Sequence, residues 1–129
     1  MSRTEIAANY IRAVQTGDQA ALASLIAPDI VWHQPGRNKF SGTHHGISAV
    51  ANMLGGMMET AGGTFAITGV SRYMENGNWV AIELEFAAQR EGYLLSQQGL
   101  DLLRIENGQI VEARLFSSDQ DQEDAFWGH

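Results

Sequence analysis

A regular alternation of apolar and polar residues over the C-terminal half is the feature that most constrains the fold of this chain. From Thr64 onward the pattern repeats every two residues, as in strands whose side chains point alternately to two faces. Three turn signals divide this stretch, and an Asn-Gly pair is a particularly strong sign of a hairpin. The signals are Asn76-Gly77, Glu91-Gly92 and Asn107-Gly108. We therefore expect four strands, over 65–73, 79–89, 93–105 and 110–117, in a mostly antiparallel sheet.

The N-terminal half carries helical patterns. Ser2 and Glu5 have the spacing of a capping box, and apolar residues then recur on one helical face up to Gly17. Asp18 can cap a second helix over 20–26, which Pro28 ends, and a third is expected from residue 48 to about 60. A strand over 30–34 and a polar loop over 36–46 lie between these two. Helices followed by strands predict an α+β fold with three helices on one face of a curved sheet, and a pocket between the two layers.

Composition limits the classes of function. Eight Lys and Arg residues against fifteen Asp and Glu residues leave a formal net charge of −7. Such a charge repels phosphate backbones and anionic lipid, so we expect neither nucleic-acid nor membrane partners. The absence of cysteine excludes disulfides, thiolate nucleophiles and cysteine-based metal sites. No apolar leader or membrane span is recognisable, which favours a cytoplasmic protein, and 129 residues favour one domain over 1–129.

Two motifs that suggest metal binding are better explained otherwise. His44 and His45 are adjacent, so on an extended chain their side chains point to opposite sides. The acidic residues of segment 119–124 lack the ordered spacing and central glycine of a calcium loop. We expect no metal, and we interpret 119–129 as an acidic tail that is either solvated or starts a helix. Its Phe126-Trp127 pair either closes a pocket or packs against a second subunit.

Several segments together resemble one known superfamily. These are Tyr10 to Asp18, Ala27 to Trp32, the following His33-Gln34-Pro35-Gly36, the loop from Ser41 to Gly46, the hairpin at Asn107-Gly108, and the ending Asp119 to Trp127. The chain resembles the ketosteroid-isomerase-like and SnoaL-like families of the nuclear-transport-factor-2-like superfamily. This resemblance implies a cone-shaped, curved, mostly antiparallel sheet wrapped around three helices. It also implies a homodimer that pairs through the outer face of the sheet.

The resemblance suggests roles for three positions. Tyr10 matches the oxyanion-hole tyrosine of the steroid isomerases, and Asp101 matches their protonated oxyanion-hole aspartate. The general base of those enzymes corresponds to Gln34, whose amide cannot abstract a proton at neutral pH. We therefore do not expect standard ketosteroid isomerase activity.

The alternation of side chains refines these candidates. Along 97–105 the inward set includes Asp101, where desolvation would raise the pKa of the carboxyl; the alternative is an outward, solvated aspartate. His33 is a candidate base because the ordinary pKa of histidine, about 6.5, suits proton transfer at neutral pH. Strict alternation puts Trp32 and Gln34 on one face and His33 on the other, so only a bulge near Pro35 would bring His33 into the pocket.

Other residues are expected to bind the substrate or to stay outside. For substrate binding we expect Gln34, Trp32, Leu103, Phe86 and Phe116. The resemblance to the steroid isomerases implies that Ala113, Leu115 and Ser117 point inward on the last strand, whereas a bulge would admit Arg114 and Phe116 instead. Glu83 and Glu85 alternate with apolar residues and are expected to be outward charges.

These observations lead to two hypotheses of different kinds. The first is an acid/base enzyme (isomerase, aldol cyclase or dehydratase) acting on an apolar, carbonyl-bearing small molecule, with Asp101, Tyr10 and His33 as catalytic candidates. That chemistry requires neither metal nor cofactor. The second is a non-catalytic protein that binds a hydrophobic ligand or serves as an accessory dimerisation module; the loss of the isomerase base favours it.

Overall fold

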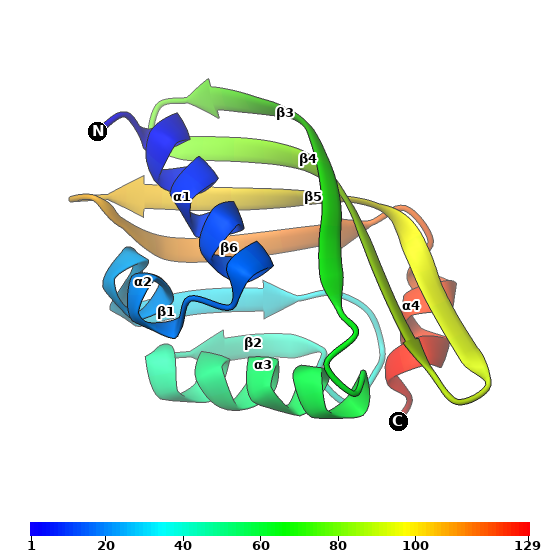
Figure 1. Ribbon diagram of the computed structural model, residues 1–129. Coiled ribbons are helices and arrows are strands. Elements are labelled where there is room, and N and C mark those ends of the chain that lie inside the picture. Colours follow the sequence, from blue (N-terminus) through cyan, green and yellow to red (C-terminus); the bar gives the residue numbers. More distant parts are fainter.

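The computed structural model describes all residues 1–129 and shows six strands in one curved sheet, in the order β2-β1-β6-β5-β4-β3 (Figure 1). The strands are β1 (Ile26–Gln34), β2 (Gly42–His45), β3 (Ala66–Asn76), β4 (Trp79–Arg90), β5 (Tyr93–Glu106) and β6 (Gln109–Ser117). The helices are α1 (Arg3–Thr16), α2 (Gln19–Leu25), α3 (Ile47–Thr60) and α4 (Gln120–Trp127). All strand pairs are antiparallel except β1 with β6. The α+β fold and the curved, mostly antiparallel sheet are confirmed.

The predicted starts and turns follow from local side-chain chemistry. The Ser2 hydroxyl accepts from the Glu5 backbone N–H and the Glu5 carboxylate accepts from the Ser2 N–H, which completes the capping box of α1. Gly17 ends this helix with φ +68°, a left-handed conformation that glycine adopts without strain. At the β5–β6 turn, Asn107 and Gly108 have φ of +52° and +77°. A two-residue type I′ hairpin requires a positive φ at both of these residues.

Two boundaries differ from the prediction. Pro28 does not follow a helix; it lies within β1, in the stretch between Ile26 and Val31 where the register with β6 shifts. A proline is tolerated there because an irregular stretch does not need its missing N–H for a regular ladder. The polar loop over 36–46 contains the edge strand β2, which pairs with β1 through backbone bonds and has no apolar alternation that could reveal it.

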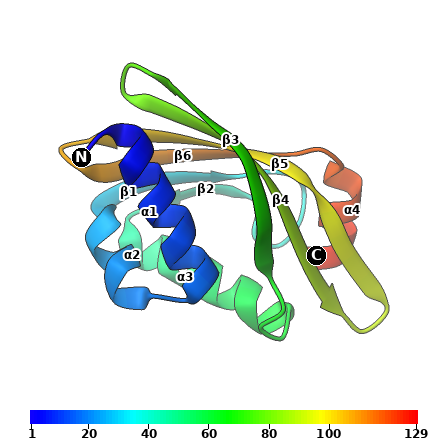
Figure 2. The same ribbon diagram turned by 45° about the horizontal axis from the view of Figure 1, so that its top comes forward.

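The concave face of the sheet carries the core. On β4, Val80, Ile82 and Leu84 are buried, while Glu83 and Glu85 lie on the outer face, as predicted. The inward set of β5 is confirmed as well: Gln97, Gly99, Asp101, Leu103 and Ile105. Helices α1 and α3 lie in front of this face (Figures 1 and 2). No helix of the structure is both long and apolar enough to cross a membrane.

The C-terminal segment forms the helix α4, which is one of the two alternatives expected for the acidic tail. Asp119 caps α4 by accepting from the Gln122 N–H, and the acidic residues of the first turn suit the positive end of the helix. Phe126 and Trp127 are each only 1% exposed. Figure 2 shows α4 beside the β4–β5 hairpin, at one end of the sheet. The aromatic pair therefore closes the interior of its own chain.

Two anchors hold α4 in place. The Asp124 Oδ1 atom accepts hydrogen bonds from the Arg37 backbone N–H at 3.0 Å, from Asn38 Nδ2 at 2.9 Å and from Gln120 Nε2 at 3.0 Å. Burial acts to raise the pKa of Asp124, but these hydrogen bonds outweigh it and lower the pKa below its ordinary value. At the other end, Arg90 Nε donates to the Phe126 carbonyl oxygen at 2.5 Å.

Gly99 in the middle of β5 gives a direct test of this packing. A Cβ atom there would lie 2.8 Å from Phe86 Cε1 and 2.9 Å from the Phe116 carbonyl oxygen. We expect Gly99→Ala to lower the free energy of unfolding by about 1–3 kcal/mol, measured by urea denaturation, because the backbone oxygen cannot move aside. The matched control is Gly69→Ala on β3, where the nearest atom is 3.9 Å away. Equal stability of the two variants would contradict this packing.

Candidate functional site

Asp101 and Tyr10 are both buried in the interior, on β5 and α1. Asp101 points inward from β5, between Ile82 of β4 and Leu115 of β6, and is 8% exposed. Tyr10 is on the buried face of α1 and is 5% exposed. Burial, with a smaller contribution from the charge of Glu123, raises the pKa of Asp101 to about 7. Burial, and secondly the charge of Asp101, also raises the pKa of Tyr10, so its phenol stays protonated.

Neither of these groups has a hydrogen-bond partner in the protein. The hydrogen bonds of the structure include none to the Asp101 carboxyl or the Tyr10 hydroxyl. Every side-chain nitrogen or oxygen atom that is completely shielded from solvent nevertheless has a hydrogen-bond partner. Their oxygens therefore still border space that a water molecule can touch. A protonated carboxyl and a phenol left free in this way are both available to donate to a third group.

Gln34 lies on the concave face, in the row of residues that runs across the strands through Leu115 and Asp101. Its side-chain oxygen accepts from Trp32 Nε1 at 3.0 Å, and both residues are buried. The register places His33 beside Arg114, so the next residue, Gln34, lies beside Leu115, which itself pairs with Asp101. Two strand spacings, roughly 10 Å, thus separate the Gln34 and Asp101 backbones. The amide nitrogen of Gln34 remains free to donate from the opposite side of the row.

His33 is not part of this interior site, which corrects one of the catalytic predictions. The strand continues its alternation without the bulge that would turn His33 inward. Its ring lies on the outer face, with Nε2 2.7 Å from Glu112 Oε2 and Nδ1 3.2 Å from Thr43 Oγ1. The hydrogen bond from His33 is the largest cause of a lowered pKa of Glu112.

The structure separates the expected lining residues into two groups. Trp32, Leu103 and Phe86 are buried on the concave face, as predicted. Phe116 is not: it is 51% exposed and lies on the outer face beside Leu100. Its placement on the concave side was wrong because β6 keeps a regular register with β5 from residue 112 to 117.

Glu123 was missed by the sequence interpretation. It is 4% exposed, and its Oε1 atom accepts from Ser117 Oγ at 2.7 Å and from Gln120 Nε2 at 3.0 Å. Its Oε2 atom accepts from Trp127 Nε1 at 3.2 Å. Helical spacing carried the missing signal, since residues three and four positions apart share a face and Phe126 and Trp127 follow Glu123 at that distance.

Aromatic side chains fill the end of the interior next to α4. The Trp127 ring lies 5.6 Å from Phe40, 6.3 Å from Phe65 and 4.9 Å from Phe126, between centroids. Phe65 in turn packs 6.0 Å from Phe86. The wide conical pocket that we expected is therefore occupied in large part by the protein's own side chains.

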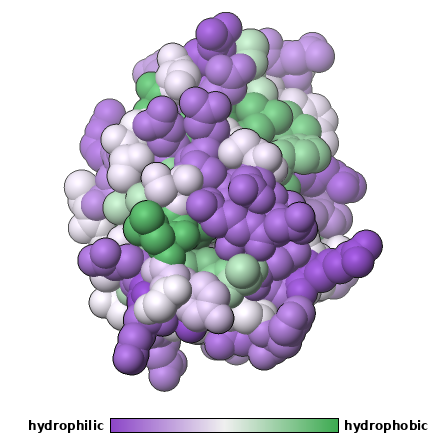
Figure 3. All heavy atoms as spheres, turned by 90° about the vertical axis from the view of Figure 1, so that its right-hand side faces the viewer, coloured by the Kyte–Doolittle hydropathy of each residue, from purple (hydrophilic) through white to green (hydrophobic).

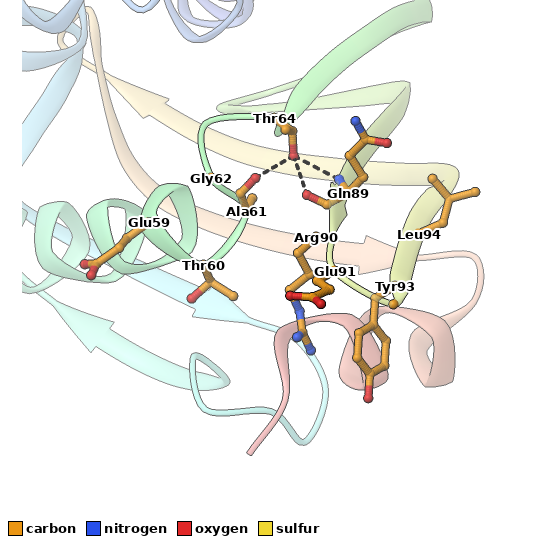
Figure 4. A pocket seen from close by; sticks show the side chains of 11 residues that line it. Glu59, Thr60, Ala61, Gly62, Thr64, Gln89, Arg90, Glu91, Tyr93 and Leu94 are labelled. Atoms are coloured by element: carbon orange, nitrogen blue, oxygen red, sulfur yellow. Dashed lines mark hydrogen bonds between the residues drawn. The ribbon is translucent and has the colours of Figure 1, made fainter.

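An open hollow lies outside this aromatic cluster. It has a volume of about 670 Å³ between the end of α3 and the β4–β5 hairpin, and Thr64, Arg90 and Tyr93 are among its lining residues (Figure 4). Thr64 Oγ1 there donates to the Ala61 carbonyl oxygen at 2.6 Å. Figure 3 shows that this end of the molecule is mainly hydrophilic, with separate apolar patches. The hollow is open to solvent and does not include Tyr10, Gln34 or Asp101.

The His and acidic residues do not gather into a metal site. No group of three or more His, Asp or Glu side chains is arranged so that it could hold a metal ion. The ring of His44 instead makes a hydrogen bond to the Phe40 carbonyl oxygen at 2.8 Å.

The unpaired burial of Asp101 predicts an unusual dependence of stability on pH. Its pKa is raised in the folded state, so the unfolded chain releases this proton first and stability falls as the pH rises from about 4 to 7. We expect Asp101→Asn to be more stable than wild type, with an advantage that grows by about 2 kcal/mol between pH 5 and pH 8. Urea denaturation at both pH values measures it.

The control for this prediction is Asp29→Asn, which removes the same charge from an exposed position on β1. Its stability difference from wild type should show no such growth. An Asp101→Asn advantage that stays constant from pH 5 to pH 8 would contradict a raised pKa at Asp101.

Comparison with known proteins places the chain among similar structures. A family model described as a SnoaL-like domain matches residues 7–113. A crystal structure of a protein of unknown function from Xanthomonas campestris is 60% identical, with 100% of both chains covered and a TM-score of 0.98. Bal32a, from a soil-derived mobile gene cassette, is 25% identical over 97% of this chain and 95% of its own, with a TM-score of 0.91.

A third structure shares the fold at lower identity. IdmH from Streptomyces antibioticus, described as a candidate polyketide cyclase, is 21% identical, with 92% of this chain and 93% of its own covered and a TM-score of 0.76. The search of curated proteins gave no match.

Proposed function

Because this chain belongs to the SnoaL-like family, we propose that it is an acid/base enzyme acting on a mostly apolar small molecule that bears a carbonyl group. The reaction is proton transfer at a carbon next to that carbonyl, as in isomerisation, aldol cyclisation or dehydration. The fold shared with IdmH, a candidate polyketide cyclase, agrees with substrates of this class. The single observation that carries the proposal is a buried carboxyl without a protein hydrogen-bond partner, whose charge acts on a buried phenol.

Asp101 supplies the proton transfer. With a pKa of about 7, its carboxyl is present in both forms near neutral pH, which is the condition under which one group works as base and as acid. The ionised form takes a proton from the carbon next to the carbonyl, and an enolate forms. In an isomerisation the protonated form then returns the proton to another carbon of the enolate. In an aldol cyclisation it protonates the alkoxide that forms with the new carbon–carbon bond, and in a dehydration it protonates the hydroxyl that leaves as water. In each case the carboxylate is regenerated.

Tyr10 and Gln34 support the carbonyl. The raised pKa of Tyr10 keeps its phenol protonated, so it donates a hydrogen bond to the oxygen on which negative charge develops. The free amide nitrogen of Gln34 orients the substrate from the other side of the row. The apolar side chains of Trp32, Leu103 and Phe86 suit the hydrocarbon part of the substrate.

The substrate enters by displacing side chains at the aromatic end. Trp127 and Phe126 of α4 are buried in the aromatic cluster at this end of the interior. Arg90, which lines the open hollow, also donates to the carbonyl of Phe126. A movement of α4 is therefore a step of binding in this proposal.

A second candidate function is non-catalytic binding of a hydrophobic ligand. Gln34 occupies the position of the isomerase base, and the aromatic cluster fills much of the interior. Both features suit a protein that holds a small apolar ligand and performs no proton transfer.

Deuterium exchange distinguishes the two candidates. We expect the protein to catalyse exchange of the α-protons of a cyclic ketone in D₂O, followed by proton NMR. Asp101→Asn should lower the rate by about 10²–10⁴-fold, and Tyr10→Phe by about 10²–10³-fold because an oxyanion donor is lost. The control is His33→Gln on the outer face, which should leave the rate unchanged.

Binding of a naphthol, followed by its fluorescence, completes this test. If naphthol binding weakens in the Asp101 and Tyr10 variants and the wild-type protein has no exchange activity, the result supports the ligand-binding function and contradicts the enzyme. Absence of both binding and exchange would contradict both candidates.

We also propose that two copies of the chain associate through the outer face of the sheet, as the family resemblance implies. Phe116 is 51% exposed on that face, beside Leu100 of β5. We expect Phe116→Asp to convert a dimer into a monomer in light scattering after size exclusion, because a charge cannot be buried at an apolar contact. Leu94→Asp on the β4–β5 hairpin, where the leucine is 66% exposed, is the control that should remain dimeric. A wild-type monomer would overturn this proposal.

A further inference from the structure

Glu123 is a buried carboxyl group whose two oxygen atoms both accept hydrogen bonds. Ser117 and Gln120 donate to one oxygen and Trp127 donates to the other, at 2.7, 3.0 and 3.2 Å. A carboxyl that only accepts hydrogen bonds is suited to the ionised form. Asp101 has the opposite environment, since nothing donates to it. Two buried acids with different surroundings thus share one interior.

The sheet register sets the distance between these acids. Ser117, which donates to Glu123, pairs with Gly99, two residues before Asp101 on the same face of β5. Diagonal neighbours on one face of an antiparallel pair lie roughly 7–8 Å apart. Helix α4 therefore brings the Glu123 carboxylate over the row next to Asp101, within range of a strong repulsion in a poorly hydrated interior.

No other charged group opposes this effect at Asp101. The neighbours on β4 and β6 are the apolar Ile82 and Leu115, and α1 contributes the neutral phenol of Tyr10. None of the ion pairs of the structure involves Asp101. The charge of Glu123 is thus the one electrostatic influence of a neighbouring side chain on this carboxyl.

We infer that Glu123 is a positioning residue of the site: α4 carries its carboxylate into the interior, and this charge adds to the effect of burial by increasing the proton affinity of Asp101. The inference rests on the proposed function for the catalytic use of Asp101, but the electrostatic coupling itself does not. Glu123 touches no reacting atom in this arrangement. Its effect is to make Asp101 a stronger base when ionised and a protonated donor over a wider pH range. Docking of the C-terminal helix and acid/base chemistry at Asp101 are thereby linked.

The test is the titration of Asp101, followed through its side-chain carboxyl carbon by ¹³C NMR in the full-length protein. In wild type we expect a midpoint near pH 7. Glu123→Gln removes a negative charge, so ionisation of Asp101 becomes easier, and the midpoint should fall by about one pH unit. The matched control is Asp121→Asn, which removes the same charge from an exposed position on α4 and should leave the midpoint unchanged.

A second variant covers the case in which Glu123→Gln does not fold. Glu123→Asp keeps the charge but withdraws it by one methylene group, so we expect a smaller fall of the midpoint in the same direction. An unchanged or higher midpoint in either folded variant overturns the inference.

The outcomes also separate this inference from the proposed function. A midpoint that responds to Glu123 in a protein without exchange activity supports the coupling and contradicts the enzyme. If exchange activity depends on Asp101 but the midpoint of the Asp101 titration is the same in the Glu123 variants as in wild type, the result supports the enzyme and contradicts the coupling.

Discussion

Docking of α4 against the open end of the curved sheet is the interaction on which the interior of this protein depends. The buried rings of Phe126 and Trp127 complete the aromatic cluster, and each contributes on the order of 2–3 kcal/mol by leaving water. Asp124 ties the helix to the loop before β2, and Arg90 caps its last turn. These contacts also decide the electrostatics of the concave face, because the same helix buries Glu123.

The two interior carboxyl groups, Asp101 and Glu123, have different surroundings within the same fold. Glu123 is surrounded by hydrogen-bond donors, and Asp101 lies among apolar side chains without any. An unpaired buried acid costs stability at neutral pH, a cost that purely structural positions rarely carry. A buried carboxyl of this kind, facing the same interior as the phenol of Tyr10, is the feature on which the proposed acid/base function rests. The Gln34–Trp32 hydrogen bond restrains a third polar group in the same row.

Much of the fold was predictable because its causes are local. The two-residue alternation and the Asn-Gly turns lead directly to β3, β4, β5 and β6, since each depends only on neighbouring residues. The inward position of Asp101 follows from the same alternation. The edge strand β2 was not predictable, because a polar four-residue segment forms a strand only when β1 is already beside it. Pro28 misled the prediction for a similar reason: its place in β1 depends on an irregular register with β6.

The amino-acid sequence by itself determined which residues of β4 and β5 face inward, and so that the carboxyl group of Asp101 lies in the interior. It also determined that Gln34, lacking a proton-accepting group, cannot be the base. Only the tertiary structure decided that His33 pairs with Glu112 on the outer face, that Phe116 stays exposed, and that α4 fills the expected pocket. The physical reason is that alternation is a property of one strand, whereas the closing of a cone depends on contacts between segments far apart in the chain.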